Sequence, residues 1–136
     1  FGASGPLILF GESLGAGVAA AASARVGHAG IAGLVLATPW DRLENVAAHH
    51  YPWLPRPLLS LFLRDRYDSA AHLAGWRGPS AVIVAERDRI VPADSGRALF
   101  AALAGDKALR VVAGADHNDW MARVGPAWWR ETLAPM

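Results

Sequence analysis

The chain has 136 residues, of which 53% are hydrophobic and 18% charged, and its formal net charge is +1. This composition is typical of one well-buried α/β domain and excludes a disordered segment. The 13 basic residues are scattered, so nucleic acid is not expected as a partner, and the absence of cysteine excludes disulfides and thiolate metal sites.

The first predicted strand leads directly into a glycine-flanked serine. An apolar run over Leu7–Phe10 is followed by Gly11-Glu-Ser13-Leu-Gly15, and a helix is predicted over 14–25. A serine with glycine two residues to either side, at a strand-to-helix turn, is the signature of a nucleophile elbow. The tight bend predicts an unusual backbone conformation at the serine. A Cβ atom at either glycine position is expected to collide with neighbouring backbone.

Strands and helices alternate along the rest of the chain. Apolar runs typical of buried parallel strands predict further strands at 31–37, 81–85 and 109–112. One helix is predicted to begin at Pro92 or Ala93 and to run to Ala104, where Gly105 caps it, and a final helix is predicted over 120–133. An irregular, helix-leaning insert at 41–78 lies between the second and third strands, and Leu58–Leu63 within it predicts a short helix.

This alternation predicts an α/β fold, with a parallel sheet of about four strands and helices on both faces. In such sheets, functional side chains gather in the loops beyond the carboxyl ends of the strands. Ser13 follows the first predicted strand, Asp88 the third and His117 the fourth. The three side chains are therefore expected at one edge of the sheet.

A serine, an aspartate and a histidine at one sheet edge are the residue types of a catalytic triad. A serine hydroxyl is a poor nucleophile at neutral pH, so a histidine must take its proton and a carboxylate must hold that histidine in the right tautomer. Ser13, Asp88 and His117 occur in the chain order that α/β-hydrolases use. Of the five histidines, only His117 follows the last predicted strand.

Other carboxylates compete with Asp88 for the role of the acid. Glu86 is expected to belong to the end of the third strand, and Glu12 to anchor the turn at the serine rather than to take part in chemistry. Asp116 and Asp119 flank the histidine so closely that they are poorly placed to contact its Nδ1. Asp119 or Asn118 is expected instead to cap a helix.

The three motifs resemble those of the α/β-hydrolase superfamily: Gly-Glu-Ser13-Leu-Gly-Ala-Gly, Glu-Arg-Asp88-Arg-Ile-Val-Pro92 and Gly-Ala-Asp-His117-Asn-Asp. More narrowly, they resemble its serine-aminopeptidase-like, abhydrolase-domain branch. The resemblance implies that residues 1–136 form a single domain lacking its N-terminal strands, with a short cap-like insert at 41–78. It also implies that the second oxyanion-hole donor has no counterpart here, which leaves the Leu14 N–H.

The expected function is that of a serine hydrolase acting on a carboxylic ester, or a related acyl or amide bond, through an acyl-enzyme intermediate. A small acyl substrate is expected, with no cofactor, no metal and no nucleic acid. No apolar run reaches the about 18 residues that a membrane span needs, so membrane contact is not indicated in this segment, and a cytoplasmic location is slightly favoured. The candidates for an apolar substrate pocket are Trp40, His49, Tyr51 and Trp53.

Other readings of the sequence remain. The chain could be a non-catalytic fragment or binding partner that retains the three residues by descent. Gly15-x-Gly17-x-x-Ala20, followed by Asp41, formally matches a dinucleotide fingerprint, but it begins beyond the turn and leaves the other motifs unexplained. A metal site at the adjacent pair His49–His50 is disfavoured because no second cluster accompanies it.

Overall fold

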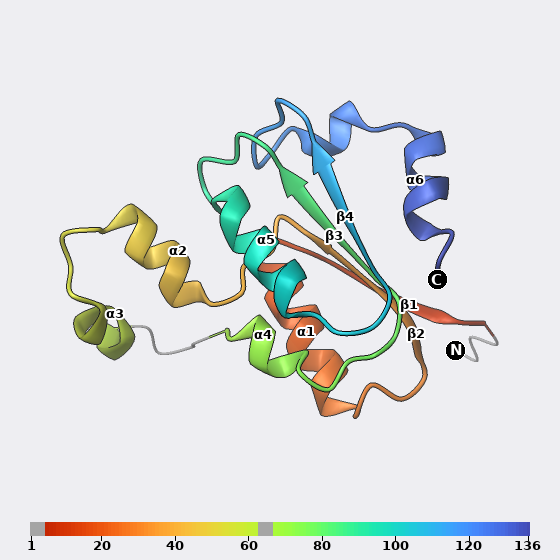
Figure 1. The fold of residues 1–136 in the computed structure, drawn as a ribbon, viewed down its shortest axis with the longest axis horizontal. Coiled ribbons are helices and arrows are strands. Elements are labelled where there is room, and N and C mark those ends of the chain that lie inside the picture. The colour runs from red at the N-terminus through yellow and green to blue at the C-terminus, as the bar shows by residue number, and fades with distance from the viewer. Residues whose placement is uncertain (1–4, 63–66) are drawn as a thin grey trace.

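A computed structural model describes residues 5–62 and 67–136 of the chain. Within these residues, four strands form one sheet in the order β1-β2-β3-β4, and each strand pairs in parallel with the next (Figure 1). The predicted α/β class and the sequential parallel sheet are confirmed. The strands are β1 (Leu7–Glu12), β2 (Ile31–Ala37), β3 (Ser80–Ala85) and β4 (Lys107–Val112).

One face of the sheet packs against three helices. These are α1 (Leu14–Arg25), α4 (Ser69–His72) and α5 (Ala93–Ala102). Alternate residues of the two central strands, such as Leu36 and Val84, point into this layer with 0% and 2% of their surface exposed. The alanine-rich sequence of α1 gives the helix a thin inner face and lets it lie close to the sheet.

The opposite face packs against the C-terminal segment of the chain. Val35 and Ile83, which alternate with the residues of the first layer, contact a cluster built around Trp120, a side chain with 0% exposure. Helix α6 (Pro126–Leu133) adds its tryptophans to this cluster. The two central strands are thus buried on both faces, as their continuous apolar sequences predict.

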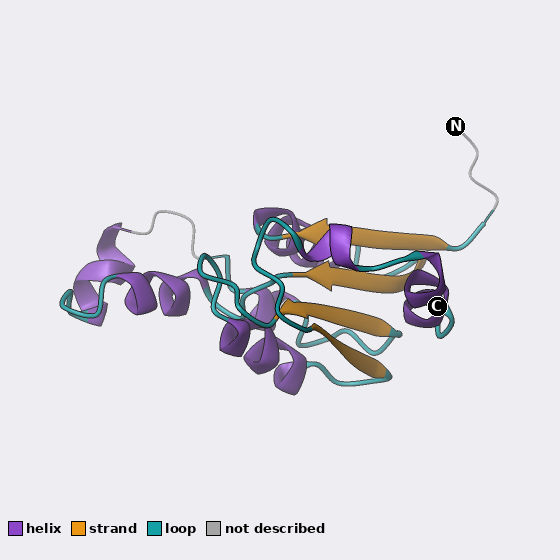
Figure 2. Cartoon of the chain, turned by 90° about the horizontal axis from the view of Figure 1, so that it is seen from above, coloured by secondary structure: helices purple, strands orange, loops and turns teal. Residues whose placement is uncertain are grey.

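The described residues of the insert at 41–78 form three helices: α2 (Leu43–His50), α3 (Arg56–Phe62) and α4. Figure 2 shows α2 and α3 projecting beyond the sheet, on the side toward which the strand arrows point. The helix expected over Leu58–Leu63 corresponds to α3, and its last residue lies outside the described residues. The insert is therefore next to the edge of the sheet where the candidate site is expected.

The prediction of one continuous helix over 120–133 is wrong. It is divided into a 3₁₀ turn, η1 (Trp120–Arg123), and α6, because Val124 and Gly125 are extended. Pro126 explains the break, since a proline disfavours helical conformation in the residue before it and has no N–H to donate.

The helix predicted over 93–104 ends earlier than expected, at Ala102, because Leu103 is extended. Gly105 therefore does not cap the helix directly. Its φ is +85°, and a Cβ atom there would lie 2.4 Å from the carbonyl oxygen of Arg77. A close backbone approach, rather than helix capping, accounts for this glycine.

No helix in the described ranges is both long enough and apolar enough to cross a membrane.

Candidate active site

Ser13 is the single residue between the end of β1 and the start of α1. Its φ of 51° and ψ of −119° lie in a region that residues with a side chain rarely adopt, so the expected unusual conformation is present. The backbone N–H of Ser13 donates to the carbonyl of Ala37 at 2.9 Å, which ties the turn to the end of β2. The N–H of Leu14, the first residue of α1, has no acceptor among the described residues.

The two glycines of the serine motif differ in their surroundings. A Cβ atom at Gly11 would lie 2.4 Å from the carbonyl oxygen of Gly15 and 2.7 Å from the Cα of Ala16, so only glycine fits there. The expected collision at Gly15 is wrong: a Cβ atom at that position would meet nothing within 4 Å in the described structure. Gly15 lies inside α1, and it approaches the strand through its carbonyl oxygen, which is the atom that a Cβ at Gly11 would meet.

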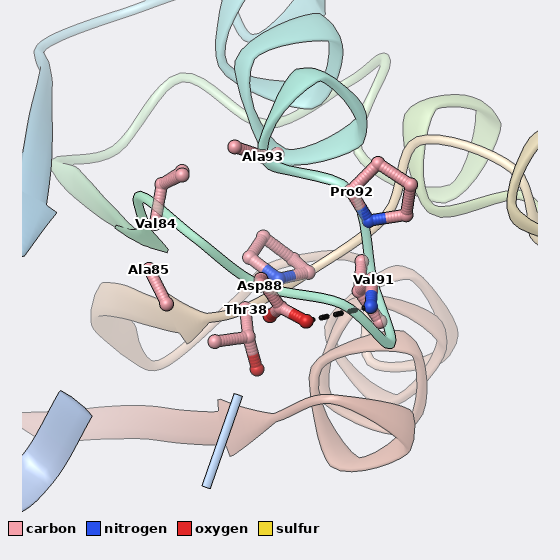
Figure 3. Close-up of a pocket in the computed structure, with 9 residues that line it drawn as sticks. Thr38, Val84, Ala85, Asp88, Val91, Pro92 and Ala93 are labelled. Atoms are coloured by element: carbon pink, nitrogen blue, oxygen red, sulfur yellow. Dashed lines mark hydrogen bonds between the residues drawn. The ribbon is translucent and has the colours of Figure 1, made fainter. Parts of the chain in front are cut away.

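Asp88 lies in the loop after β3, and its side chain is 0% exposed. Its Oδ1 accepts hydrogen bonds from the backbone N–H groups of Ile90 and Val91, both at 2.8 Å, and Figure 3 shows the bond to Val91. A small space beside the carboxylate, lined by residues of β3, the loop and the start of α5, has no room for a water molecule. The loop therefore fixes one carboxylate oxygen and leaves Oδ2 for another partner.

His117 follows β4 and joins the other two side chains. Its Nδ1 lies 2.7 Å from Oδ2 of Asp88, and its Nε2 lies 3.0 Å from Oγ of Ser13. In the tautomer that satisfies both contacts, Nδ1–H donates to the carboxylate and the serine hydroxyl donates to Nε2. The histidine side chain is only 9% exposed. The structure thus brings the three predicted residues together from three strand ends, in one chain of hydrogen bonds.

The surroundings of His117 favour its charged form. The hydrogen bond to Asp88 is the largest cause, and it raises the pKa of His117 above the usual 6.5. Burial opposes this shift, whereas the negative charges of Asp88, Glu12 and Asp116 add to it. A histidine in this setting is well prepared to accept and hold a proton at Nε2.

The competing carboxylates have other partners. Glu12 accepts a hydrogen bond from the indole N–H of Trp120 at 2.8 Å, consistent with an anchoring role at the turn. Glu86 accepts the backbone N–H of Gly114 at 2.7 Å. Asp119 occupies the position before η1 but makes no capping bond there, because its carboxylate accepts the N–H of Asp116 instead. None of these contacts involves the ring of the histidine.

The four candidate pocket residues do not converge. Trp40 is 5% exposed and packs in the core, and its indole N–H donates to the carbonyl of Tyr67 at 3.2 Å. His49 lines an open cleft of about 260 Å³ between α2 and the start of α5. Tyr51 and Trp53 are 52% and 74% exposed and contact each other edge to face. The sequence pattern could not separate a core tryptophan from a surface one, since Trp40 directly precedes the irregular insert that contains Trp53.

Sequence reasoning missed the backbone groups and side chains that support the site. The N–H groups of Ile90 and Val91, the carbonyl of Ala37 and the indole of Trp120 each hold one of its members or its neighbour. Of these groups, only the N–H groups of Ile90 and Val91 could have been recognised from the sequence. An aspartate commonly accepts from the backbone two residues further along the chain, which makes the Asp-x-Ile-Val spacing informative.

The alternative sites receive no support from the geometry. Gly15, Gly17 and Ala20 all lie inside α1, so the dinucleotide fingerprint has no phosphate-binding turn. Gly17 instead lies where a Cβ atom would approach the rings of Tyr67 and Trp40. Among the described residues, no group of three or more histidine, cysteine, aspartate or glutamate side chains could hold a metal ion.

No protein-family model matches the chain. In sequence, it is 44% identical over 110 residues to uncharacterized proteins of two Mycobacterium tuberculosis strains, an alignment that covers 81% of this chain and 37% of each relative. The chain therefore spans about a third of the length of the curated relatives it matches.

Solved structures resemble the chain over nearly its whole length. The acetyl xylan esterase 1 of Thermoanaerobacterium sp. superposes with a TM-score of 0.67 at 14% identity, covering 94% of this chain and 44% of the esterase. The esterase domain of a Rhodothermus marinus protein superposes with a TM-score of 0.64 at 18% identity, covering 96% of this chain and 58% of that domain's chain. For the monoacylglycerol lipase of Paleococcus ferrophilus, the TM-score is 0.57 at 21% identity, and the match covers 93% of this chain and 64% of the lipase. The chain has an α/β-hydrolase fold.

Proposed function

We propose that the chain carries the catalytic residues of a serine hydrolase that acts on carboxylic esters or related acyl bonds. The observation that carries the proposal is the hydrogen-bonded series Ser13 Oγ, His117 and Asp88, with separations of 3.0 Å and 2.7 Å. These are the distances at which a base can take a proton from a serine while a carboxylate orients the base. The esterase and lipase structures with this fold agree with such an activity.

In the proposed reaction, Nε2 of His117 takes the hydroxyl proton as Ser13 Oγ attacks the carbonyl carbon of the substrate. The tetrahedral oxyanion faces the N–H of Leu14 and the positive end of the α1 dipole. Collapse returns the proton from Nε2 to the leaving group and leaves an acyl group on Ser13. Water then gives a proton to the same nitrogen and attacks the acyl carbon, which frees the acid and restores the serine. The sequence of steps needs no metal and no cofactor.

The backbone of Ser13 favours catalysis over a group of residues retained by descent. A residue with a side chain and a positive φ of this kind costs about 1–3 kcal/mol, and such strain persists where the surrounding structure imposes it, often at functional sites. Ser13 bears it between a strand and a helix, with its Oγ on the base. His28, Thr38 and Tyr67 also have positive φ, but among the described residues only Ser13 combines it with a hydrogen bond to the ring of His117 at Nε2.

The narrower proposal is a serine-aminopeptidase-like hydrolase with a small, uncharged acyl substrate. The motifs around Asp88 and His117 support the branch. The exposed aromatic side chains of Tyr51 and Trp53, on the segment between α2 and α3, support an apolar or aromatic acyl group, because this segment projects beyond the strand ends where Ser13 lies (Figure 2).

Labelling with a serine-directed fluorophosphonate tests the proposed function. We expect covalent modification of Ser13, lost in Ser13→Ala and in His117→Ala. Ser95→Ala is a matched control, since Ser95 is also buried near the strand ends, at 8% exposure, but has no contact with His117 among the described residues. Absence of labelling in the folded wild-type chain, or equal labelling of Ser13→Ala, would contradict the proposal.

A further inference from the structure

A single carboxylate joins the two loops that carry Asp88 and His117. Oδ1 of Asp116 accepts the backbone N–H of Arg89, the residue after the acid, at 3.1 Å. The same oxygen accepts the backbone N–H of His117 at 2.8 Å. Oδ2 accepts a bond from Nε of Arg89 at 2.6 Å. Asp116 therefore contacts the backbone beside both members of the 2.7 Å Asp88–His117 pair.

We propose that Asp116 is a positioning residue that clamps the acid loop to the histidine loop and thereby fixes the separation of Asp88 and His117. This inference rests on the proposed function and deepens it. Among the described residues, Asp116 makes no hydrogen bond to Oγ of Ser13 or to the ring of His117. Its effect passes through the backbone of its two neighbours.

The clamp lies where the sheet no longer holds the chain. Backbone pairing between β3 and β4 ends at Ala85 and Val112. Beyond it, the N–H of Arg87 still donates to the carbonyl of Ala115 at 2.8 Å. Two residues further, the N–H of Arg89 has no backbone acceptor in the described structure, and the Asp116 carboxylate takes that place. The side chain thus extends the link between the loops as far as the histidine itself.

The backbone N–H groups that Asp116 joins also keep its carboxyl group ionised at neutral pH. Its pKa is lowered from 3.8 to about 2, mainly by the backbone N–H groups of His117 and Arg89, with a smaller part from the Arg89 side chain. Hydrogen bonds from backbone N–H groups to an ionised carboxylate are shorter and stronger than neutral ones. The guanidinium adds little to this, because the Arg89 side chain is 87% exposed and surface ion pairs are weak.

Asp119 provides a matched control on the same turn. Its Oδ1 accepts the backbone N–H of Asp116 at 2.7 Å, and its Oδ2 pairs with Arg123 at 2.6 Å. It thus makes one backbone bond and one arginine pair, as a structural residue of this turn would. Within the described ranges it has no contact with the acid loop. Its removal should loosen the turn without releasing the clamp.

The test compares Asp116→Ala, Asp116→Asn, Asp116→Glu, Arg89→Gln and Asp119→Ala. Three quantities are measured: the rate at which a fluorophosphonate labels Ser13, the low-field proton NMR signal of Nδ1–H of His117, and stability in urea. Displacements of about 1 Å cost up to about 100-fold in rate. We therefore expect Ser13 in Asp116→Ala to be labelled at least about tenfold more slowly than in the wild type, and the NMR signal of Nδ1–H to be lost. Asp119→Ala should lose stability but label within about twofold of the wild type.

The other variants separate geometry from charge. Asp116→Asn keeps an oxygen for both N–H groups, so its labelling rate should stay within about threefold of the wild type although the charge is gone. Asp116→Glu keeps the charge but displaces the oxygen by a methylene, so it should label as slowly as Asp116→Ala, and it replaces that variant if the alanine protein does not fold. Arg89→Gln should label within about twofold.

Several results would overturn the inference. Labelling of both Asp116→Ala and Asp116→Glu at the rate of Asp119→Ala would refute the clamp. Labelling of Asp116→Asn as slowly as Asp116→Glu would also refute it, because the effect would then belong to the charge. If the wild type is not labelled, the proposed function has failed, but the NMR signal still decides on the clamp. An unchanged Nδ1–H signal in both Asp116→Ala and Asp116→Glu would then refute it.

Discussion

The two glycines around Ser13 allow a matched test of the turn. Gly11→Ala and Gly15→Ala add the same methyl group four residues apart, yet we expect opposite effects on the stability of the protein. At Gly11 the new Cβ would lie 2.4 Å from the carbonyl oxygen of Gly15 and 2.7 Å from the Cα of Ala16. Both neighbours are backbone atoms in the first turn of α1, so no side-chain rotation can relieve the contact.

The size of the destabilisation by Gly11→Ala follows from this overlap of atoms. To restore an ordinary contact, the first turn of α1 must retreat from β1 by about 1 Å. Overpacking of this kind typically costs about 1–3 kcal/mol, and we expect Gly11→Ala to fall at the upper end because backbone must move. The same shift carries Ser13 Oγ away from Nε2 of His117, now 3.0 Å away. The labelling rate should therefore drop by about two orders of magnitude.

Gly15→Ala should behave in the opposite way. A Cβ atom there has nothing within 4 Å in the described structure, and the residue lies inside α1. Alanine in a helix is more stable than glycine by about 0.5–1 kcal/mol, so this variant should be slightly stabilised and should label normally. Urea unfolding followed by tryptophan fluorescence gives the free energies. Equal destabilisation by the two substitutions, or wild-type stability of Gly11→Ala, would refute the reasoning.

Three further predictions concern the same site. Ser13→Gly should be more stable in urea than Ser13→Ala by about 1 kcal/mol, because glycine relieves the positive φ that alanine retains; an alanine variant that is equally stable would contradict the strain. The labelling rate of Ser13 should rise with pH through the raised pKa of His117, above 6.5, because the base must be neutral, and Asp88→Asn should move this rise to lower pH and reduce the rate. The ion-pair contribution of His117 to stability has the opposite dependence: it is complete below about 6.5 and is lost as the pH rises through the raised value. Finally, the chain alone should hydrolyse a p-nitrophenyl ester about two to three orders of magnitude more slowly than a version with the full length of the curated relatives. The reason is that the turn supplies one oxyanion donor, the N–H of Leu14. Rapid turnover by the chain alone would contradict this prediction.

The fold was predictable because the buried strands have continuous apolar sequences. The run Ile31–Ala37 is apolar throughout, and the structure forms β2 over the same residues. Helix α1 likewise has its predicted bounds. The errors fall where a single backbone angle decides the outcome, as at Leu103 and Gly125, since a local pattern of apolar residues says nothing about where a helix gives way to an extended residue.

The candidate site was predictable to the extent that it depends on strand order. Ser13, Asp88 and His117 converge because parallel strands place their carboxyl ends together. What supports them was less accessible. Backbone N–H groups hold Asp88 and a backbone carbonyl holds Ser13, and every residue has such groups, so no side-chain pattern can mark them. The exposure of the four candidate pocket residues was not predictable from the sequence either, since burial in and beside an irregular insert depends on how its helices dock.

The surface beside Ser13 explains why slow turnover is expected of the chain alone. Helix α1 has no charged residue before Arg25, and a helix that is apolar on all sides is normally covered on all sides. Its outer residues Leu14 and Val18 are nevertheless both 52% exposed, beside β1 at the edge of the sheet. Leu14 also carries the N–H that faces the proposed oxyanion. If a segment of a longer protein covers this stripe, it lies next to the proposed oxyanion, where a second N–H donor would stabilise the negative charge further. One contact would then both protect the sheet edge and complete the site.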